Sequence, residues 1–354
     1  MMENILILGG AGFIGSSLAL NLKQQYSDAH IICLDNLRRR GSELNLPRFK
    51  AANIEFIHGD IRSESDLDPA ILSVDTIIDC SAEPSVLAGF SSPQYVLQTN
   101  LVGTINILEL ARKLSARLLF LSTSRVYPIE PIKQLKLMEA ETRFQLASEQ
   151  PYPGISPQGI SEDFPLTGAR SLYGATKLAS ELLIEEYRHA YGLKAIINRC
   201  GVITGPWQMG KVDQGVFTFW MAAHYFKKSL RYIGYGGTGK QVRDLLHVND
   251  LFNLVQYQLE HFDQLDGDVL NVGGGLAVSL SLLETTQICA DITGHQIPIE
   301  GVLAEREGDV PLFITDARKI QEKTGWKPAY SAQQTLLEIY QWIQQHESLL
   351  AGIL

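Results

Sequence analysis

The 354-residue sequence has few cysteines and no pattern that would join them. Cys33, Cys80, Cys200 and Cys289 are scattered along the chain and form no CxxC pair. Such spacing argues against a disulfide framework and favours reduced, mostly buried thiols in a cytosolic protein. The eight histidines show no HExxH or similar ligand spacing, so we expect no metal site.

Long apolar runs and an excess of basic charge are also missing. No apolar run approaches the roughly 20 residues that span a membrane, so we expect no membrane partner. The first residues, MMENILILGGAGFIG, lack a basic segment, and their glycines favour a strand and turn over a signal peptide. The formal net charge of -9 argues against nucleic-acid binding, which needs a basic surface. A few local arginines would still suffice to bind an anionic small molecule.

Short apolar runs alternate with helical patterns through the first 200 residues. Segments such as 102–114 and 175–191 have helical periodicity. This alternation predicts βαβ units, and therefore an α/β fold with a Rossmann-type doubly wound parallel sheet. The expected strands lie near residues 5–8, 31–34, 54–57, 76–78, 118–121 and 195–198.

The length of the chain suggests about two domains. We expect a cofactor-binding domain over residues 1–200 and a smaller α/β domain over residues 201–354, which exchanges elements with the first. Residues 128–170 are rich in proline and show no convincing strand. Loops of this length are usually functional or disordered. Four apolar side chains favour a packed flap here, namely Phe144, Leu146, Tyr152 and Phe164, and a final amphipathic helix is expected at Ala332–Gln345.

A glycine-rich motif, GGAGFIG, directly follows the first expected strand. Its Gly9, Gly12 and Gly15 permit a tight turn, a close approach of the backbone to a pyrophosphate, and tight helix packing. A helix that starts here would direct free N–H groups at the phosphates. Asp35 ends the second strand, 20 residues after Gly15, where a carboxylate would bind both hydroxyls of an adenosine ribose.

The carboxylate of Asp35 also bears on the choice of cofactor. It would repel a 2′-phosphate and therefore favours NAD over NADP. The counter-evidence is the run of arginines at 38–40, which could bind such a phosphate. The third strand runs into HGDIR, where Asp60 and Ile61 would either bracket the adenine or form only a strand-end turn.

The stretch LYGATK places Tyr173 four residues before Lys177. In a helix, these two side chains lie one turn apart on the same face. The spacing alone fits a surface pair, and it equally fits a catalytic pair in which the ammonium makes the phenol acidic.

Five motifs in order resemble the extended short-chain dehydrogenase/reductases that act on nucleotide sugars. They are GGAGFIG, DN at 35–36, GDIR, STSRVY at 122–127 and YGATK, and the resemblance runs from residue 4 to about residue 342. It implies a homo-oligomer, a dimer or tetramer, that pairs through helices such as those expected at 102–114 and 175–191.

The resemblance implies a catalytic triad of Thr123, Tyr173 and Lys177. Tyr173 would take the proton from a sugar hydroxyl, Thr123 would hold that oxygen, and Lys177 would bind the nicotinamide ribose and acidify the phenol. At about 5 Å and an effective dielectric near 20, one ammonium stabilises a phenolate by roughly 3 kcal/mol. That lowers a pKa near 10 by about two units, which brings Tyr173 towards the range that a general base requires.

By the same resemblance, the other contacts lie in turns that follow strands. NAD would be bound by Gly9, Gly12, Phe13, Ile14, Gly15, Asp35, Asn36, Asp60, Ile61, Ser81, Ala82, Glu83, Asn100, Ser122 and Cys200. The substrate would contact Ser124, Arg125, Val202, Asp213, Gln214, Gln241, Arg243 and Arg306.

The family comprises several reactions. In its 4,6-dehydratases, an Asp-Glu pair follows the active-site Thr and drives the elimination of water. Ser124 and Arg125 occupy these positions here, which disfavours dehydration. The segments GTGKQVRDLLHVNDL and AEREGD resemble those in which Arg243 and Arg306 would bind the diphosphate of the sugar nucleotide, although each arginine alone equally fits a surface ion pair.

More particular matches resemble the CDP-paratose 2-epimerases, also called CDP-tyvelose epimerases. These are DNLRRRGSELNL, HGDIR, AETRF, DQGVFTFW and GKQVRDLLH. They imply an enzyme with tightly bound NAD that oxidises a CDP-hexose at C2, holds a 2-keto intermediate and returns hydride to the opposite face. The alternatives are a UDP-hexose 4-epimerase with the same triad, a 4,6-dehydratase and a non-catalytic NAD-binding regulator.

The sequence departs from the common family pattern in three places. Residues 79–83, Asp-Cys-Ser-Ala-Glu, stand where many relatives have His-Leu-Ala-Gly-Gln. Pro128 replaces a glycine, and Val202 occupies a position usually held by Asn or Ser. We therefore expect the sugar, more than the class of reaction, to differ from that of the relatives.

Overall fold

The computed structural model describes residues 4–211 and 214–354, in two compact units. The first unit comprises Met1–Val126, Leu172–Arg199 and Phe252–Leu270. The second unit comprises Tyr127–Ser171, Cys200–Leu251 and Asn271–Leu354.

The chain passes between the units more than once. Tyr127–Ser171, which contains the flap expected at 128–170 in the first domain, groups with the second unit, while Phe252–Leu270 groups with the first. Contacts with Asn271 hold the flap in the second unit. The Asn271 N–H donates to Glu162 Oε1 (2.6 Å), and its Oδ1 accepts from the Tyr127 hydroxyl (2.7 Å). The expected roles of the two halves in binding NAD and the nucleotide sugar stay a prediction.

The first unit is built around a seven-stranded sheet of order β14-β10-β5-β4-β1-β2-β3. The neighbours β1 and β2, β1 and β4, β2 and β3, and β4 and β5 are parallel, so their carboxyl ends lie along one edge. The predicted doubly wound α/β fold is confirmed, with small differences at the strand ends and one further strand, β14 (Val269–Val272), that was not predicted. The strands are β1 (Asn4–Leu8), β2 (His30–Asp35), β3 (Glu55–His58), β4 (Thr76–Asp79), β5 (Arg117–Thr123), β10 (Ala195–Cys200) and β14 (Val269–Val272).

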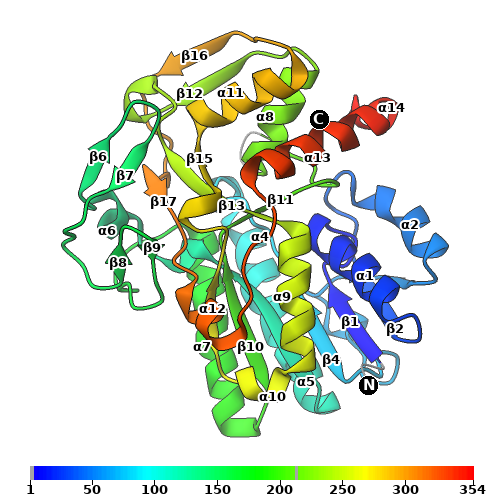
Figure 1. Cartoon of the computed structure of the whole chain (residues 1–354). Helices are drawn as coiled ribbons and strands as arrows, with labels where there is room; N and C mark the ends of the chain where they lie inside the picture. The colour runs from blue at the N-terminus through cyan, green and yellow to red at the C-terminus, as the bar shows by residue number, and fades with distance from the viewer. Residues whose placement is uncertain (1–3, 212–213) are drawn as a thin grey trace. The chain divides into compact units, whose positions relative to one another are not determined.

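Helices cover this sheet (Figure 1). Helix α1 packs on β1 and β2, while α5 and α7 pack against each other and α7 also contacts β5. The long helices are α1 (Phe13–Gln25), α5 (Gly103–Leu114), α7 (Leu172–Tyr191) and α9 (Val248–Glu260). Shorter ones are η1 (Ser42–Asn45), α2 (Leu46–Ala51), η2 (Glu64–Asp66), α3 (Ala88–Ser91), α4 (Pro93–Leu97), the π-helix η3 (Gln98–Val102), η4 (Ser124–Val126) and α10 (Phe262–Leu265).

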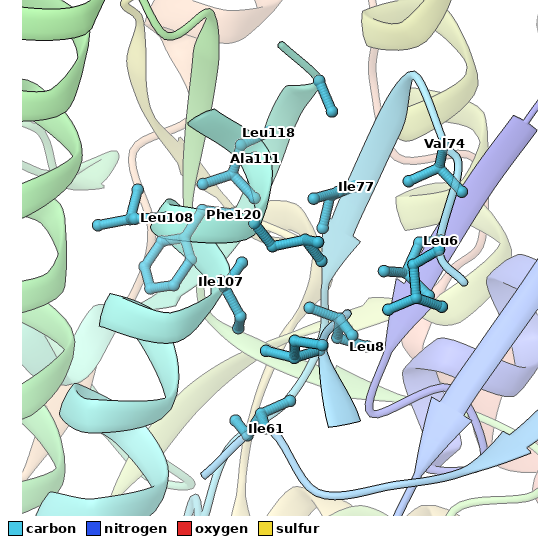
Figure 2. Packing of buried hydrophobic residues seen from close by; sticks show 14 of the residues in the cluster. Leu6, Leu8, Ile61, Val74, Ile77, Ile107, Leu108, Ala111, Leu118 and Phe120 are labelled. Carbon is cyan, nitrogen blue, oxygen red and sulfur yellow. The ribbon is translucent and has the colours of Figure 1, made fainter. Parts of the chain in front are cut away.

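The core of the first unit lies between the sheet and its helices. Leu8, Ile77, Ile107 and Phe120 are each fully buried in one cluster, which Figure 2 shows from close by. The central strands read as continuous apolar runs because both of their faces are covered. Each such side chain contributes about 1.5–3 kcal/mol by burial. The buried strands thereby form a rigid base for the turns at their carboxyl ends.

The second unit contains a smaller sheet of order β11-β13-β15, with β17 beside β13. Its strands are β11 (Val202–Thr204), β13 (Val242–His247), β15 (Ser279–Ser281) and β17 (Leu312–Phe313), and a separate pair joins β12 (Leu230–Ile233) to β16 (Ile299–Val302). The helices are α6 (Ile129–Lys133), α8 (Val216–Tyr225), η5 (Tyr235–Gly237), η6 (Leu276–Val278), α11 (Leu282–Thr293), α12 (Arg318–Thr324), α13 (Ala332–Gln345) and α14 (Glu347–Leu350). The expected final helix is confirmed as α13. No helix in the parts of the chain that the structure describes is both long and apolar enough to cross a membrane.

The flap contains strands, and the expectation that it has none was wrong. The strands β6 (Leu137–Glu139) and β7 (Phe144–Leu146) pair antiparallel, as do β8 (Ile155–Ser156) and β9 (Gly159–Ile160). Strands of two or three residues are too short for an alternating pattern to be visible in sequence. The predicted packing is confirmed, because Phe164 is 1% exposed and its ring contacts Tyr152.

Candidate functional site

The glycine-rich turn between β1 and α1 depends on its glycines. Gly9 has a left-handed φ of +65°, and a Cβ there would lie 2.8 Å from Ser81 Cα. A Cβ on Gly15 would lie 2.3 Å from the Gly9 oxygen. By contrast, a Cβ on Gly12 would meet only the Gly9 oxygen, at 3.1 Å, so the space beside Gly12 is open. This turn is shaped for the close approach of another group to its backbone.

The turn leads directly into the N-terminus of α1. Gly12 is the N-cap and provides no side chain to bind the first amides, so the N–H groups of Phe13 and Ile14 point out of the helix. The first turn carries no acidic residue. Outward N–H groups at the positive end of a helix dipole fit a pyrophosphate.

Asp35 stands beside this turn, at the end of β2. Its Oδ2 accepts from the Ala11 N–H (3.1 Å) and its Oδ1 from the Leu37 N–H (2.7 Å). Burial raises the pKa of the carboxyl, while these backbone donors oppose that rise. Buried Asn45 donates to the Ala11 carbonyl (2.9 Å) and holds the turn from outside. The predicted ribose-binding carboxylate is therefore fixed at the mouth of the glycine turn.

The turn after β3 places Asp60 next to Asn36. The Asn36 amide donates to Asp60 Oδ2 (2.9 Å), and Arg62 binds both oxygens of the same carboxylate. The Arg62 guanidinium holds the pKa of Asp60 well below its usual range. The side chain of Ile61 lies in the core, where it would meet a Cβ on Gly103 at 2.5 Å (Figure 2). Any contact of Ile61 with a ligand would therefore be made by its backbone, and not by its side chain.

The turn after β4 carries the half-exposed Ser81, Ala82 and Glu83. Buried Asn100, in η3, accepts from the Glu83 N–H (2.8 Å) and donates to the Glu83 carbonyl (3.1 Å). Single π-helical turns are frequent at functional sites. Asp79 Oδ1 accepts from the Ser81 N–H (2.9 Å), whereas its Oδ2 has no hydrogen-bond partner in residues 4–211 or 214–354.

The three residues of the predicted triad lie on two neighbouring elements. Thr123 ends β5 and is 7% exposed, while Tyr173 and Lys177 lie in the first turns of α7. Lys177 is 2% exposed, and its Nζ lies 3.7 Å from the ring centre of Phe120 in β5. Asp79 is paired in register with Phe120, so the two side chains lie on the same face of the sheet. Burial raises the pKa of Asp79, and the positive charge of Lys177 opposes this rise.

Sequence reasoning missed a buried ion pair behind the triad. Glu181 Oε2 accepts from Arg199 Nη2 (2.7 Å), and the two side chains are 5% and 7% exposed. Ser122, assigned to the cofactor, donates to Glu181. A signal was present, because Glu181 follows Lys177 at the same spacing of four at which Lys177 follows Tyr173.

Several predicted residues flank these elements. Ser124 and Arg125 follow Thr123 in η4 and are half-exposed, and the Arg125 N–H donates to Thr123 Oγ1 (3.1 Å). In the second unit, Cys200 is 6% exposed and Val202 is half-exposed at the start of β11.

The second unit brings together the two segments assigned to the diphosphate. Arg243 Nη2 pairs with Asp309 Oδ1 (2.6 Å) and donates to the Val310 carbonyl (2.7 Å), and Nη1 donates to the Val242 carbonyl (2.7 Å). Two of the five guanidinium N–H donors then remain for a ligand. The carbonyl of half-buried Arg306 accepts from the Asp309 N–H (3.2 Å).

Gln241 lies in the same segment and is 6% exposed. Its Nε2 donates to the Ile233 carbonyl (3.2 Å), but its buried Oε1 has no donor among the described residues. Gln214 exchanges backbone hydrogen bonds with Lys211 (2.8 and 3.0 Å). Asp213, assigned to the substrate, lies outside the described residues.

The geometry of the first unit fits a dinucleotide, and comparisons with known proteins lead to the same class. The family described as "NAD dependent epimerase/dehydratase family" matches residues 5–273. CDP-paratose 2-epimerase from Salmonella typhi is 31% identical over 345 residues, which cover 96% of this chain and 98% of that protein.

Two solved structures show the range of reactions among similar folds. UDP-glucose 4-epimerase from Thermotoga maritima, with UDP-glucose, has a TM-score of 0.76 and 26% identity, over 98% of this chain and 100% of that one. dTDP-glucose 4,6-dehydratase from Bacillus anthracis, in complex with NAD, has a TM-score of 0.77 and 26% identity, over 99% of this chain and 100% of that one. The predicted resemblance to the extended short-chain dehydrogenase/reductases is confirmed. The chain therefore belongs to the NAD dependent epimerase/dehydratase family, and it is an NAD-dependent enzyme.

Proposed function

We propose that this enzyme is a nucleotide-sugar epimerase that inverts C2 of a CDP-hexose. The main support is the placement of Tyr173 and the buried Lys177 in the first turns of α7, beside the end of β5 with Thr123. The choice of C2 and of CDP rests on the similarity to the CDP-paratose 2-epimerase of Salmonella typhi over 96% of this chain.

The cofactor would be held by the first unit. The amides at the start of α1 would bind its pyrophosphate, because they point outward beside the open space at Gly12. The carboxylate of Asp35 would accept from the ribose hydroxyls. When bound, NAD supplies a reversible hydride acceptor.

Tyr173 would act as the general base. Its phenolate would remove the proton of the C2 hydroxyl as that carbon loses hydride, which leaves a 2-keto sugar. Thr123 would hydrogen-bond the same oxygen, and the ammonium of Lys177 would favour the phenolate. The proton returns from Tyr173 to the oxygen when hydride is added to the opposite face, so the net change is an inversion with no redox change.

The residues after Thr123 disfavour dehydration, and polar side chains of the second unit support the binding of a sugar diphosphate. Ser124 and Arg125, which follow Thr123, provide no carboxyl group for the elimination of water. Arg243 keeps two N–H donors for an anion, and the buried Oε1 of Gln241 lacks a donor that a sugar or base could supply. Arg306 would complete the diphosphate contacts.

A UDP-hexose 4-epimerase is the second candidate, supported by the similarity to the Thermotoga maritima enzyme. The test is NMR of the products formed from a panel of CDP- and UDP-hexoses in deuterated buffer. We expect inversion at C2 of a CDP-hexose. Inversion at C4 alone would reject the proposal in favour of the second candidate, and a lack of turnover with every sugar would reject both.

A further inference from the structure

Two arginines and one tyrosine form a stack beside the predicted ribose site. The guanidinium carbon of Arg38 lies 4.1 Å from the ring centre of Tyr95, and that of Arg62 lies 5.1 Å from it. Tyr95 belongs to α4, and no motif in the sequence points to it. A cavity of about 280 Å³ lies here, lined by Asn36, Arg38, His58, Gly59, Asp60, Arg62 and Asp66.

The two arginines differ in their other contacts. Arg62 is bound through two guanidinium nitrogens to Asp60 (2.9 and 2.6 Å), so the Asp60 carboxylate balances its positive charge. The Arg38 side chain has no carboxylate within ion-pair distance in the described parts of the chain, and its guanidinium contacts the ring of Tyr95. Arg38 is therefore the cation that a phosphate in this cavity would attract.

The backbone directs Arg38 to this position. Leu37 adopts a left-handed φ of +54°, which is uncommon for a bulky residue, and its N–H donates to Asp35. The Arg38 N–H then donates to Asn36 Oδ1 (3.0 Å). Leu37, two positions after the predicted ribose-binding carboxylate of Asp35, is thus held in a sharp turn, and Arg38 follows directly. Such strain is often retained at functional sites.

We propose that Tyr95 is a specificity-determining residue for NAD against NADP. Its ring binds the Arg38 guanidinium and keeps it from the ribose 2′ position, where the Asp35 carboxylate stands. A 2′-phosphate would have to detach Arg38 from Tyr95 before it gained a cation. A cation–π contact at an exposed site changes an equilibrium about two- to fivefold. The proposal rests on the cofactor position given under the proposed function.

The test uses full-length protein freed of copurified nucleotide. Isothermal titration measures the affinity for 5′-AMP and for adenosine 2′,5′-bisphosphate, and the ratio of the two reports selectivity. We expect Tyr95→Ala to shift the ratio about fivefold towards the bisphosphate, with Tyr95→Phe unchanged because it keeps the ring. Arg38→Ala added to Tyr95→Ala should abolish the shift, and Arg40→Ala should not.

Three results would overturn the proposal. One is a ratio for Tyr95→Ala that stays within about twofold of the wild-type ratio. Another is a shift that persists after Arg38→Ala. The third is a selective loss of bisphosphate affinity in the single variant Arg38→Ala, which changes an exposed side chain. That loss would mean that Arg38 already binds the 2′-phosphate in the wild type. If wild-type protein binds no 5′-AMP, the cofactor position itself is wrong, which separates that failure from failure of the Tyr95 proposal.

Discussion

The two units bury charged groups in different ways. In the first unit, Glu181 and Arg199 form an ion pair of 2.7 Å with both side chains at most 7% exposed. In the second unit, Asp244 and His247 on β13 are each 1% exposed. Asp244 accepts from the Gly275 N–H (3.2 Å) and has no cationic partner in the described residues, and His247 Nε2 lies 3.2 Å from Glu338 without the geometry of a hydrogen bond.

The difference shows how an opposite charge compensates the burial of a charged group. A buried charge is stabilised when an opposite charge and hydrogen bonds replace its hydration, as for Glu181 and Arg199. Without such a partner, burial favours the neutral form. Accordingly, burial raises the pKa of Asp244 to about 6 and lowers the pKa of His247 to about 4. The Glu181–Arg199 pair therefore places compensated charges beside the predicted triad, whereas Asp244 and His247 make the second unit respond to pH.

The largest expected effect is on turnover, through the buried charge on which the proposed function depends. Lys177→Met removes the ammonium beside Tyr173 and should reduce kcat about a thousandfold, because the phenol loses its acidity. Tyr173→Phe should have a similar effect while NAD stays bound. Steady-state assays on the CDP-hexose that the wild-type enzyme inverts provide the measurement. A kcat within tenfold of wild type in either variant would contradict the triad.

The next effect is on stability and tests the ion pair of the first unit. Arg199→Met leaves Glu181 buried without its partner and should cost about 3–5 kcal/mol of unfolding free energy. Urea unfolding measures this cost. The double variant Glu181→Gln with Arg199→Met should recover part of the loss, because neither charge is then left alone. Equal destabilisation by the single and double variants would show that the pair does not act as a unit.

The unpaired acid of the second unit should make stability depend on pH. The folded pKa of Asp244, about 6, lies above the ordinary value of 3.8. Its contribution to stability is therefore complete below the unfolded pKa and is lost as pH rises from about 4 through about 6. Relative to Asp244→Asn, the wild type should lose about 3 kcal/mol over this range. Urea unfolding between pH 4 and pH 7 tests this, and a difference that does not vary with pH would contradict it.

His247 makes the stability depend on pH in the opposite direction. Its pKa is lowered to about 4, so its contribution is present above the unfolded pKa near 6.5 and is lost as pH falls through about 4. In the wild type, the two groups partly cancel between pH 4 and pH 6. The variant Asp244→Asn should therefore lose stability more steeply on acidification than the wild type does.

The smallest effect compares two helix caps within the second unit. Ser331 and Gln334 form a capping box on α13, and Ser281 and Glu284 form one on α11. Glu284 also binds Arg143 of the flap. Ser331→Ala should cost about 1 kcal/mol and Ser281→Ala about 2 kcal/mol, because the latter also loosens the carboxylate that holds the flap. Equal shifts in the urea midpoint would show that the flap does not depend on the cap.

Continuous apolar runs made the fold of the first unit predictable. The strands at the core and the final helix α13 carry local patterns that need no knowledge of partners. The order of motifs likewise placed Tyr173 and Lys177 on one helix. The paired strands of the flap were not visible, because each has only two or three residues and its partner is chosen by packing.

Contacts between residues far apart in the sequence could not be predicted. The pattern did not reveal that the Ile61 side chain turns into the core, where it lies against Gly103. Nor did it show that Arg243 already pairs with Asp309. Such partners depend on which elements the fold brings together, and a single side chain carries no signal of that.

The central claim is that Lys177 makes Tyr173 acidic, and the absorbance of tyrosinate near 295 nm tests it most directly. Titration of NAD-bound wild-type protein against Tyr173→Phe should reveal one tyrosine in the wild type that ionises about two pKa units below the ordinary value near 10. In Lys177→Met, that step should move up to the ordinary range. Titration curves of wild type and Tyr173→Phe that coincide up to pH 9 would contradict the claim.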